Sequence, residues 1–259
     1  MGRIESLFNG RKPLIAYLTA GDPTPERTPE LVAALERGGA ELIELGVPFS
    51  DPIADGPVIQ RGSERALTAG TTVRKVLEIA RTIREKSRIP LLLFTYLNPV
   101  LRYGLEKLAA DAKAAGVDGC LLTDLSVEEA SPYVSVMRAA GLDTVFLAAP
   151  TSTPERLKLV AQYSTGFVYL VSRTGVTGER ASLSDSVQPL VAAMRQVTRL
   201  PLAVGFGIST PEQAREVAQV ADGVVVGSAF VRMIEQGGDL EAFARSLRRG
   251  IDMDERAKT

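Results

Sequence analysis

Two carboxylates stand close together in a stretch of the chain that is otherwise apolar or conformationally rigid. Glu44 lies near the end of the apolar run Leu42–Leu45, and Asp55 lies in the following loop, among prolines and glycines. An ionisable side chain in a buried strand is unfavourable unless it serves a purpose. We therefore expect Glu44 and Asp55 to be catalytic groups. The alternative is a buried glutamate that pairs with an arginine for structural reasons.

The composition excludes several familiar kinds of active site. The chain contains no histidine, which removes the usual general base, the commonest metal ligand and any Ser-His-Asp triad. Acid–base chemistry must then use carboxylates, tyrosines, lysines or groups of the substrate. No lysine stands at the end of an apolar run, so an aldolase of the Schiff-base type would lack its nucleophile.

Small residues in the second half of the chain suggest a phosphate site. They follow the last three apolar runs and are Gly175 and Gly178, Gly205 and Gly207, and Gly227 with Ser228. Glycine lets backbone N–H groups approach phosphate oxygens, and a helix N-terminus favours negative charge. One such glycine pair is usually only a turn, but three pairs at strand ends favour a phosphate site built mainly from backbone N–H groups.

The elements that position these residues repeat along the chain. Eight short runs are almost continuously apolar, as parallel strands buried on both faces are. They are Leu14–Leu18, Leu42–Leu45, Leu91–Tyr96, Cys120–Leu122, Thr144–Ala148, Phe167–Val171, Leu202–Val204 and Val224–Val226. Amphipathic stretches lie between them, among them Thr72–Lys86, Leu105–Ala115, Pro154–Tyr163 and Pro211–Val220. Thr153 and Thr210 each precede a proline and are expected to cap a helix.

Eight strand–helix units in about 250 residues predict an α/β fold, a (β/α)8 TIM barrel that forms a single domain over residues 1–259. A doubly wound open sheet is the alternative. In a barrel, catalytic groups lie at the C-terminal ends of the strands. Because strand side chains alternate, Leu42 and Glu44 should point into the barrel, and Phe167, Tyr169 and Val171 should share one face. A Tyr169 that only packs inside the barrel is the alternative to a pocket residue.

The net charge, the length of the apolar runs and the cysteine content limit the possible partners and the cellular location. The net charge of −1 gives no electrostatic footprint for nucleic acid. No apolar run approaches the roughly 18–20 residues of a membrane span. Cys120 is the single cysteine, and Met1–Asn9 makes a poor signal peptide, so we expect a cytoplasmic protein.

Several segments together resemble the α subunit of tryptophan synthase. They are Thr19-Ala20-Gly21-Asp22-Pro23, Glu44-Leu45-Gly46-Val47-Pro48-Phe49-Ser50-Asp51-Pro52, Ala54-Asp55-Gly56-Pro57, Ser172-Arg173-Thr174-Gly175-Val176-Thr177-Gly178, Gly205-Phe206-Gly207-Ile208 and Gly227-Ser228-Ala229. They occur in the family's order and span nearly the whole chain. The first two are highly specific to the family, whereas the last two occur in many phosphate-binding barrels.

The resemblance implies a lyase that cleaves indole-3-glycerol phosphate into indole and glyceraldehyde 3-phosphate for tryptophan biosynthesis. Glu44 matches the general acid–base that protonates the indole ring at C3, and Asp55 matches the carboxylate that faces the indole N–H. The residues that the resemblance places in the substrate pocket are Tyr17, Ile59, Tyr96, Tyr169, Thr177 and Phe206. The phosphate cradle would be Gly178, Gly207, Gly227 and Ser228.

The resemblance also implies a partner. It is a β subunit that receives the indole in an α2β2 heterotetramer and holds pyridoxal phosphate, so this chain would need neither metal nor cofactor. Phe49–Gln60 and Arg173–Ser186 are expected to act as lids that are poorly ordered without ligand and partner, with Thr177 closing onto Asp55. Ser126 stands where typical members carry proline, in a loop that faces the partner.

Two alternatives stay open at this point. One is a different phosphate-binding TIM-barrel enzyme, such as a sugar-phosphate isomerase or indole-3-glycerol phosphate synthase, although the latter should carry a catalytic lysine at a strand end. The other is a non-catalytic activator of a β subunit, against which the presence of both Glu44 and Asp55 argues.

Overall fold

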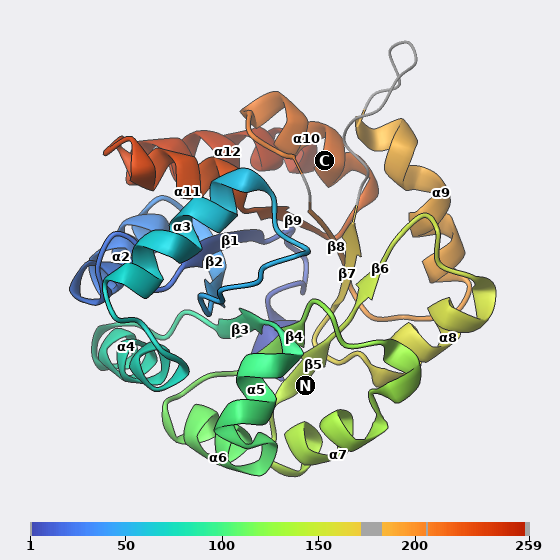
Figure 1. Cartoon of the computed structure of the whole chain (residues 1–259). Coiled ribbons are helices and arrows are strands. Elements are labelled where there is room, and N and C mark those ends of the chain that lie inside the picture. Colours follow the sequence, from blue (N-terminus) through green and yellow to red (C-terminus); the bar gives the residue numbers. More distant parts are fainter. Residues whose placement is uncertain (1, 172–182, 206, 257–259) are drawn as a thin grey trace.

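The sheet is parallel and closes almost completely into a barrel, with helices around its outside (Figure 1). The computed structural model describes residues 2–171, 183–205 and 207–256. The strands are β1 (Leu14–Thr19), β2 (Ala40–Gly46), β3 (Leu91–Thr95), β4 (Gly119–Leu122), β5 (Asp143–Val145), β6 (Leu147–Ala148), β7 (Val168–Val171), β8 (Leu202–Gly205) and β9 (Gly223–Val226). The α-helices are α1 (Arg3–Ser6), α2 (Thr28–Arg37), α3 (Pro57–Thr68), α4 (Val73–Lys86), α5 (Leu97–Tyr103), α6 (Leu105–Ala114), α7 (Ser131–Ala139), α8 (Pro154–Tyr163), α9 (Leu183–Arg195), α10 (Pro211–Val220), α11 (Ser228–Glu235) and α12 (Leu240–Arg256), with single 3-10 turns at η1 (Pro25–Arg27) and η2 (Val127–Glu129).

Strand order confirms the barrel and excludes the open sheet. The order is β5-β4-β3-β2-β1-β9-β8-β7-β6, so neighbouring strands follow the chain and β9 pairs with β1. The two edge strands, β5 and β6, are consecutive in sequence and are separated only by Phe146. The predicted single strand Thr144–Ala148 is therefore divided at Phe146, and its two parts pair with opposite neighbours. This break is why nine strands occur where eight were predicted.

Side-chain alternation divides the core into two layers. Ile15, Leu42, Leu92, Leu121, Val145, Phe167, Tyr169, Ala203 and Val225 form a cluster inside the barrel. Ile43 and Leu45 instead belong to the larger cluster between the sheet and the helices. The predicted faces of β2 and β7 are thus confirmed, and the interior face of β2 is the one that presents Glu44.

Local capping sets where several helices begin. The Thr72, Thr153 and Thr210 side chains accept hydrogen bonds from backbone N–H groups in the first turns of α4, α8 and α10. Thr210 and Gln213 form a complete capping box, in which each side chain satisfies a backbone donor. The predicted ranges of α8 and α10 are those observed.

Carboxylates join neighbouring strands at the N-terminal end of the barrel. Asp118 accepts hydrogen bonds from the Leu91 N–H at 2.9 Å and from Arg84 at 2.8 Å. Asp222 accepts from the Leu202 N–H in the same manner, at 2.7 Å, and is bound by Arg195. These pairs hold strand starts and helices together, far from the end where chemistry is expected.

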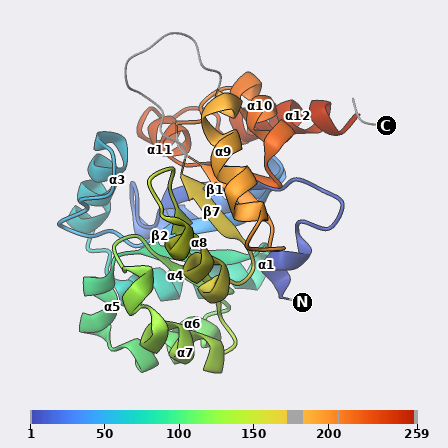
Figure 2. The same cartoon turned by 90° about the vertical axis from the view of Figure 1, so that its right-hand side faces the viewer.

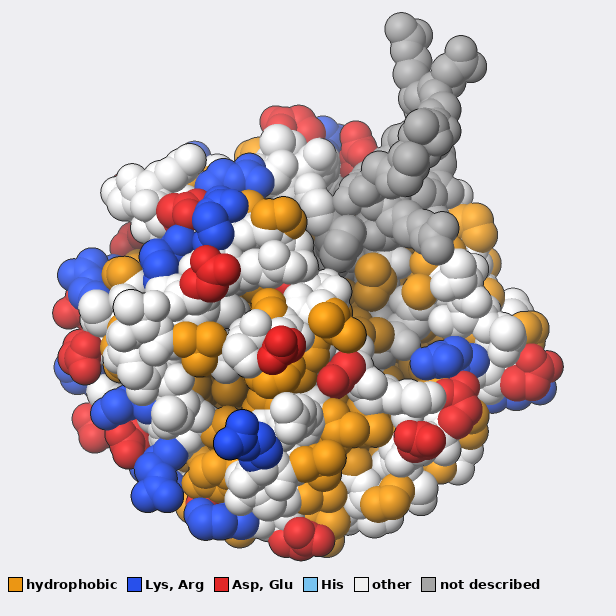
Figure 3. All heavy atoms as spheres, viewed as in Figure 1, with side chains coloured by type: hydrophobic (Ala, Val, Ile, Leu, Met, Phe, Trp, Pro, Cys, Tyr) orange, Lys and Arg blue, Asp and Glu red, His pale blue; other side chains and the backbone are white. Residues whose placement is uncertain are grey.

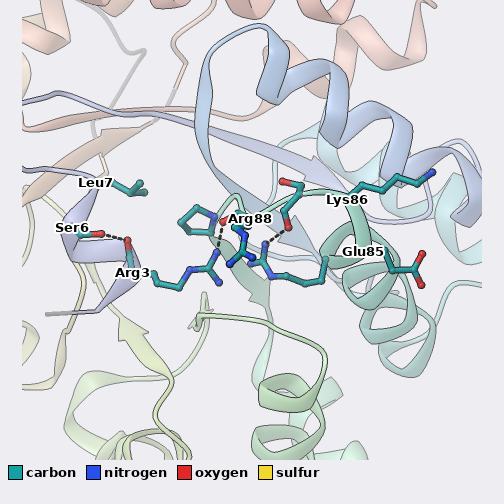
Figure 4. Close-up of a pocket in the computed structure, with 9 residues that line it drawn as sticks. Arg3, Ser6, Leu7, Glu85, Lys86 and Arg88 are labelled. Atoms are coloured by element: carbon teal, nitrogen blue, oxygen red, sulfur yellow. Dashed lines mark hydrogen bonds between the residues drawn. The ribbon is translucent and has the colours of Figure 1, made fainter.

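Helix α1 covers this N-terminal end. Figure 2 shows α1 at the end of the barrel opposite α3 and α5. Its Ile4 is fully buried in the interior cluster. A surface cavity of about 710 Å³ lies beside it, and Figure 4 shows Arg3 and Arg88 pointing into this region. Arg3 binds Asp118 at 3.0 Å and the Arg88 carbonyl, and the Arg84 donors are similarly occupied, so these guanidinium groups hold the fold together.

Candidate active site

A second cavity, of about 600 Å³, opens at the C-terminal ends of the strands. Its walls bring together residues that the sequence places far apart. The predicted site residues that line it are Tyr17, Glu44, Asp55, Ile59, Tyr169, Gly207, Gly227 and Ser228. Phe94, Thr123, Leu147, Val171 and Arg232 also contribute. Thr177, Gly178 and Phe206 lie outside the described residues, as does most of the predicted lid Arg173–Ser186.

Glu44 is a buried acid without a partner among the described residues. It lies on the interior face of β2, opposite Tyr17 of β1 and Leu92 of β3, and is 1% exposed. Its Oε1 atom makes no hydrogen bond within the described structure. Burial alone raises the pKa of Glu44 to about 8. Glu44 therefore holds a proton at neutral pH and can donate it into the cavity. No arginine of the described residues pairs with it, so the structural alternative finds no support in that part of the chain.

Asp55 has a different environment, in the loop between β2 and α3. Burial raises its pKa to about 6, and a hydrogen bond from the Tyr96 hydroxyl opposes that rise. The loop is anchored locally, since the Asp55 N–H donates to the Pro52 carbonyl at 3.0 Å and Gln60 donates to the Asp55 carbonyl at 2.9 Å. At pH 7 Asp55 is mostly ionised, whereas Glu44 is mostly protonated.

Tyr96 supports the loop rather than lining the cavity. Its hydroxyl accepts a hydrogen bond from the Ala54 N–H at 3.1 Å, and its ring lies 5.2 Å from that of Phe49. The side chain is 2% exposed. Tyr96 thus orients the carboxylate of Asp55 from behind, and contact with the indole ring stays a prediction.

Two phenols flank the cavity, and glycines make room for them. A Cβ atom on Gly46 would lie 2.2 Å from the Tyr17 hydroxyl oxygen, and one on Gly205 would lie 2.2 Å from that of Tyr169. Burial raises the pKa of both phenols, so they stay neutral. Sequence reasoning gave Gly46 no role and connected Gly205 only with phosphate. The signal that was missed is the same in both cases. A strand ends in glycine, and the neighbouring strand carries a tyrosine that points into the barrel.

The part of the cavity that is lined by Gly207, Gly227 and Ser228 is suited to an anion. Gly207 follows β8 with φ of +74°, and Gly227 is the residue before α11, whose first residue is Ser228. The unpaired N–H groups of a helix start and the helix dipole both favour negative charge. Arg232, on the same helix, lines the cavity as well and was not singled out in the sequence.

A network of ion pairs joins the helix after Asp55 to the helix of this anion site. Arg65 of α3 binds both oxygens of Asp22 at 2.8 Å, and Asp22 is 1% exposed. Arg65 also binds Glu235, the last residue of α11, at 2.8 Å. Arg61 binds the two oxygens of Glu235 at 2.9 Å each. The network holds α3, and with it the Asp55 loop, against α11.

Residues 5–255 match the family model described as tryptophan synthase alpha chain. The chain belongs to this family. It is 69% identical to the tryptophan synthase alpha chain of Solibacter usitatus over 263 residues, which cover 97% of this chain and 98% of that protein. It is 50% identical to the alpha chain of Geobacter sulfurreducens over 262 residues, with 97% and 99% covered.

Solved structures agree with the sequence relatives. The crystal structure of tryptophan synthase subunit alpha from Legionella pneumophila is 39% identical, with a TM-score of 0.86 and coverage of 98% of this chain and 99% of that one. A ligand-free tryptophan synthase structure from M. tuberculosis is 38% identical, with a TM-score of 0.89 and coverage of 97% and 99%. Family membership decides against the other phosphate-binding barrel enzymes.

Neither a metal cluster nor a membrane span is found in the described residues. No group of three or more metal-ligating side chains occurs in that part of the chain. None of the helices there is both long enough and apolar enough to cross a membrane.

Proposed function

We propose that Glu44 and Asp55 catalyse the retro-aldol cleavage of indole-3-glycerol phosphate into indole and glyceraldehyde 3-phosphate, the reaction of a tryptophan synthase α subunit. The observation that supports these two roles best is the separation of the two pKa values within one cavity. Burial raises the pKa of Glu44 to about 8 and that of Asp55 to about 6. Two carboxylates in different protonation states are what an acid and a charge stabiliser require.

The steps follow from these protonation states. Protonated Glu44 donates its proton to C3 of the indole ring, and the positive charge that develops at the ring nitrogen is stabilised by the Asp55 carboxylate. The Glu44 carboxylate then accepts the proton of the side-chain hydroxyl as the carbon–carbon bond breaks. The bonding electrons return to the ring, which leaves as indole, and the oxygen becomes the aldehyde of glyceraldehyde 3-phosphate. Glu44 ends protonated, ready for the next turnover.

The remaining predicted residues have supporting roles in this proposal. Tyr17, Ile59 and Tyr169 enclose the indole ring, together with Phe206, while Tyr96 orients Asp55. Gly207, Gly227 and Ser228 bind the phosphate through backbone N–H groups, with Gly178 completing the cradle. Thr177 closes onto Asp55 when the substrate is bound.

The same proposal covers the partner and the cell compartment. A β subunit that carries pyridoxal phosphate receives the indole in a cytoplasmic α2β2 complex, and residues 1–259 of this chain act as one domain without a cofactor. Apolar side chains surround the opening of the barrel (Figure 3). Ile53 in the Asp55 loop is 84% exposed and Leu101 of α5 is 60% exposed. Exposed apolar groups next to a cavity favour a protein interface at this end.

The decisive experiment measures indole release from indole-3-glycerol phosphate by the purified chain, alone and with a tryptophan synthase β subunit. Release by the chain alone, with stimulation by the partner and co-elution of the two, is the expected result. Glu44→Gln should lower turnover by about 10²–10⁴-fold, the usual contribution of a general acid–base. If the folded wild-type chain releases no indole but still stimulates the β subunit, the chain is a non-catalytic activator and the proposal is wrong.

A further inference from the structure

Arg232 lines the cavity together with Gly207, Gly227 and Ser228, the residues that the proposed function assigns to the phosphate. It is the one cationic side chain among the described residues that line the cavity. It stands four residues after Ser228 on α11, so the two side chains share one face of the helix. Helical side chains lean toward the N-terminus of their helix. The guanidinium therefore leans toward the helix start that forms the cradle.

The charges that the proposed substrate would bring into the cavity favour such a group. A phosphate monoester carries about −1.5 to −2 charges at pH 7. The start of a helix offers only about half a positive charge. The cavity also contains Asp55, which is ionised at that pH. Backbone N–H groups alone would leave most of the negative charge of the substrate unbalanced.

Neighbouring arginines are already committed to other partners. Arg61 donates hydrogen bonds to both carboxylate oxygens of Glu235, and Arg65 binds both Asp22 and Glu235. By contrast, no hydrogen bond or ion pair occupies the guanidinium of Arg232 within the described parts of the chain. Its charge is available to a ligand in the cavity.

We propose that Arg232 pairs with the phosphate of the substrate and makes the enzyme selective for the phosphorylated, dianionic form over indole-3-glycerol. The proposal rests on the proposed function, since it assumes that substrate. It adds a side-chain cation to a cradle that otherwise consists of backbone N–H groups and a serine.

The test compares Arg232→Gln, Arg232→Lys and wild type in the isolated chain. A charge-assisted hydrogen bond is worth roughly 1.5–3 kcal/mol, so kcat/KM for indole-3-glycerol phosphate should fall about tenfold or more in Arg232→Gln. The value for indole-3-glycerol should stay within about twofold, and inhibition by glycerol 3-phosphate should weaken in parallel. Arg232→Lys should recover much of the loss because it restores the charge. Arg215→Gln, at an exposed position on α10 outside the cavity lining, is the matched control.

The outcomes separate this inference from the proposed function. If wild type does not cleave indole-3-glycerol phosphate, the proposed function is wrong. If wild type cleaves it and Arg232→Gln keeps full selectivity for the phosphorylated substrate, Arg232 is not the counter-charge. An equal loss with both substrates would also overturn the inference, because it points to a structural role.

Discussion

Indole release should follow a bell-shaped pH profile, because the proposed reaction begins with Glu44 protonated and Asp55 ionised. The pKa of Asp55 is about 6 and that of Glu44 is about 8. The ionised fraction of Asp55 falls as the pH drops through 6, which gives the acid limb. The protonated fraction of Glu44 falls as the pH rises through 8, which gives the alkaline limb.

The size of the effect follows from the two values. At pH 7 roughly nine-tenths of each group is in the required state, so most molecules are competent. At pH 5 and at pH 9 only about one-tenth of the molecules are competent, so kcat/KM should be about tenfold lower than at pH 7. The assay is kcat/KM for indole-3-glycerol phosphate across this range at constant ionic strength.

The Tyr96 hydroxyl allows the acid limb to be assigned. Its hydrogen bond lowers the pKa of Asp55, so Tyr96→Phe should move the acid limb to higher pH. A hydrogen bond to a charged group is worth about 1.5–3 kcal/mol, which corresponds to about one to two pH units. Tyr103→Phe is the matched control, because the Tyr103 hydroxyl binds Asp111 instead.

The phosphate of the substrate also titrates near pH 6, and a second measurement removes that ambiguity. With indole-3-glycerol as substrate, an acid limb due to Asp55 should persist, whereas one due to phosphate should vanish. A limb that vanishes with this substrate, or that does not move in Tyr96→Phe, would refute the assignment to Asp55. An alkaline limb well below pH 7 would refute the protonated state of Glu44.

Three further predictions concern stability and packing. The folded chain holds the Glu44 proton more tightly than the unfolded chain, so wild type should lose stability relative to Glu44→Gln as the pH rises from about 4.5 through about 8. A shift of about 3.5 units corresponds to on the order of 5 kcal/mol, and most of it should appear between urea unfolding at pH 5 and at pH 9. Arg65→Gln should lower the free energy of unfolding by about 2 kcal/mol. This loss is smaller than for a fully buried ion pair because Arg65 is 31% exposed, and adding Asp22→Asn should recover part of the lost stability. Gly46→Ala should lower both the melting temperature and kcat, because the new methyl group must displace the Tyr17 phenol, and Tyr17→Leu should relieve part of the loss in melting temperature.

The parts of the fold that sequence predicts are those decided by local periodicity. Two-residue alternation was enough to place Leu42 and Glu44 inside the barrel and Ile43 outside it. Successive side chains of a strand point to opposite faces, so the face of one residue fixes the face of the next. Hydroxyl–proline pairs predicted the starts of α8 and α10 for the same reason. The division of the strand at Phe146 was not predicted, since it arises from how the barrel closes rather than from the composition of that run.

What sequence did not predict depends on pairs of residues that are distant along the chain. Tyr96 meets Ala54 across 42 positions, and Arg65 meets Asp22 across 43. Which strand lies beside which, and in what register, decides these contacts, and no single segment contains that information. The role of Gly46 belongs to this class, because it follows only from the register of β1 against β2.

One cavity holds three groups of different charge. Glu44 lies within the barrel among apolar and phenolic side chains, and no described cation approaches it, so burial keeps it neutral. Asp55 lies on a loop near the mouth, where a phenol can donate to it and its carboxylate stays charged. Arg232 lies on α11, the helix after the last strand, four residues after Ser228. A neutral acid, a carboxylate and a cation thus line one cavity from three different elements, a strand, a loop and a helix. In the proposed reaction the uncharged ring would face Glu44 and Asp55, and the phosphate would face Ser228 and Arg232.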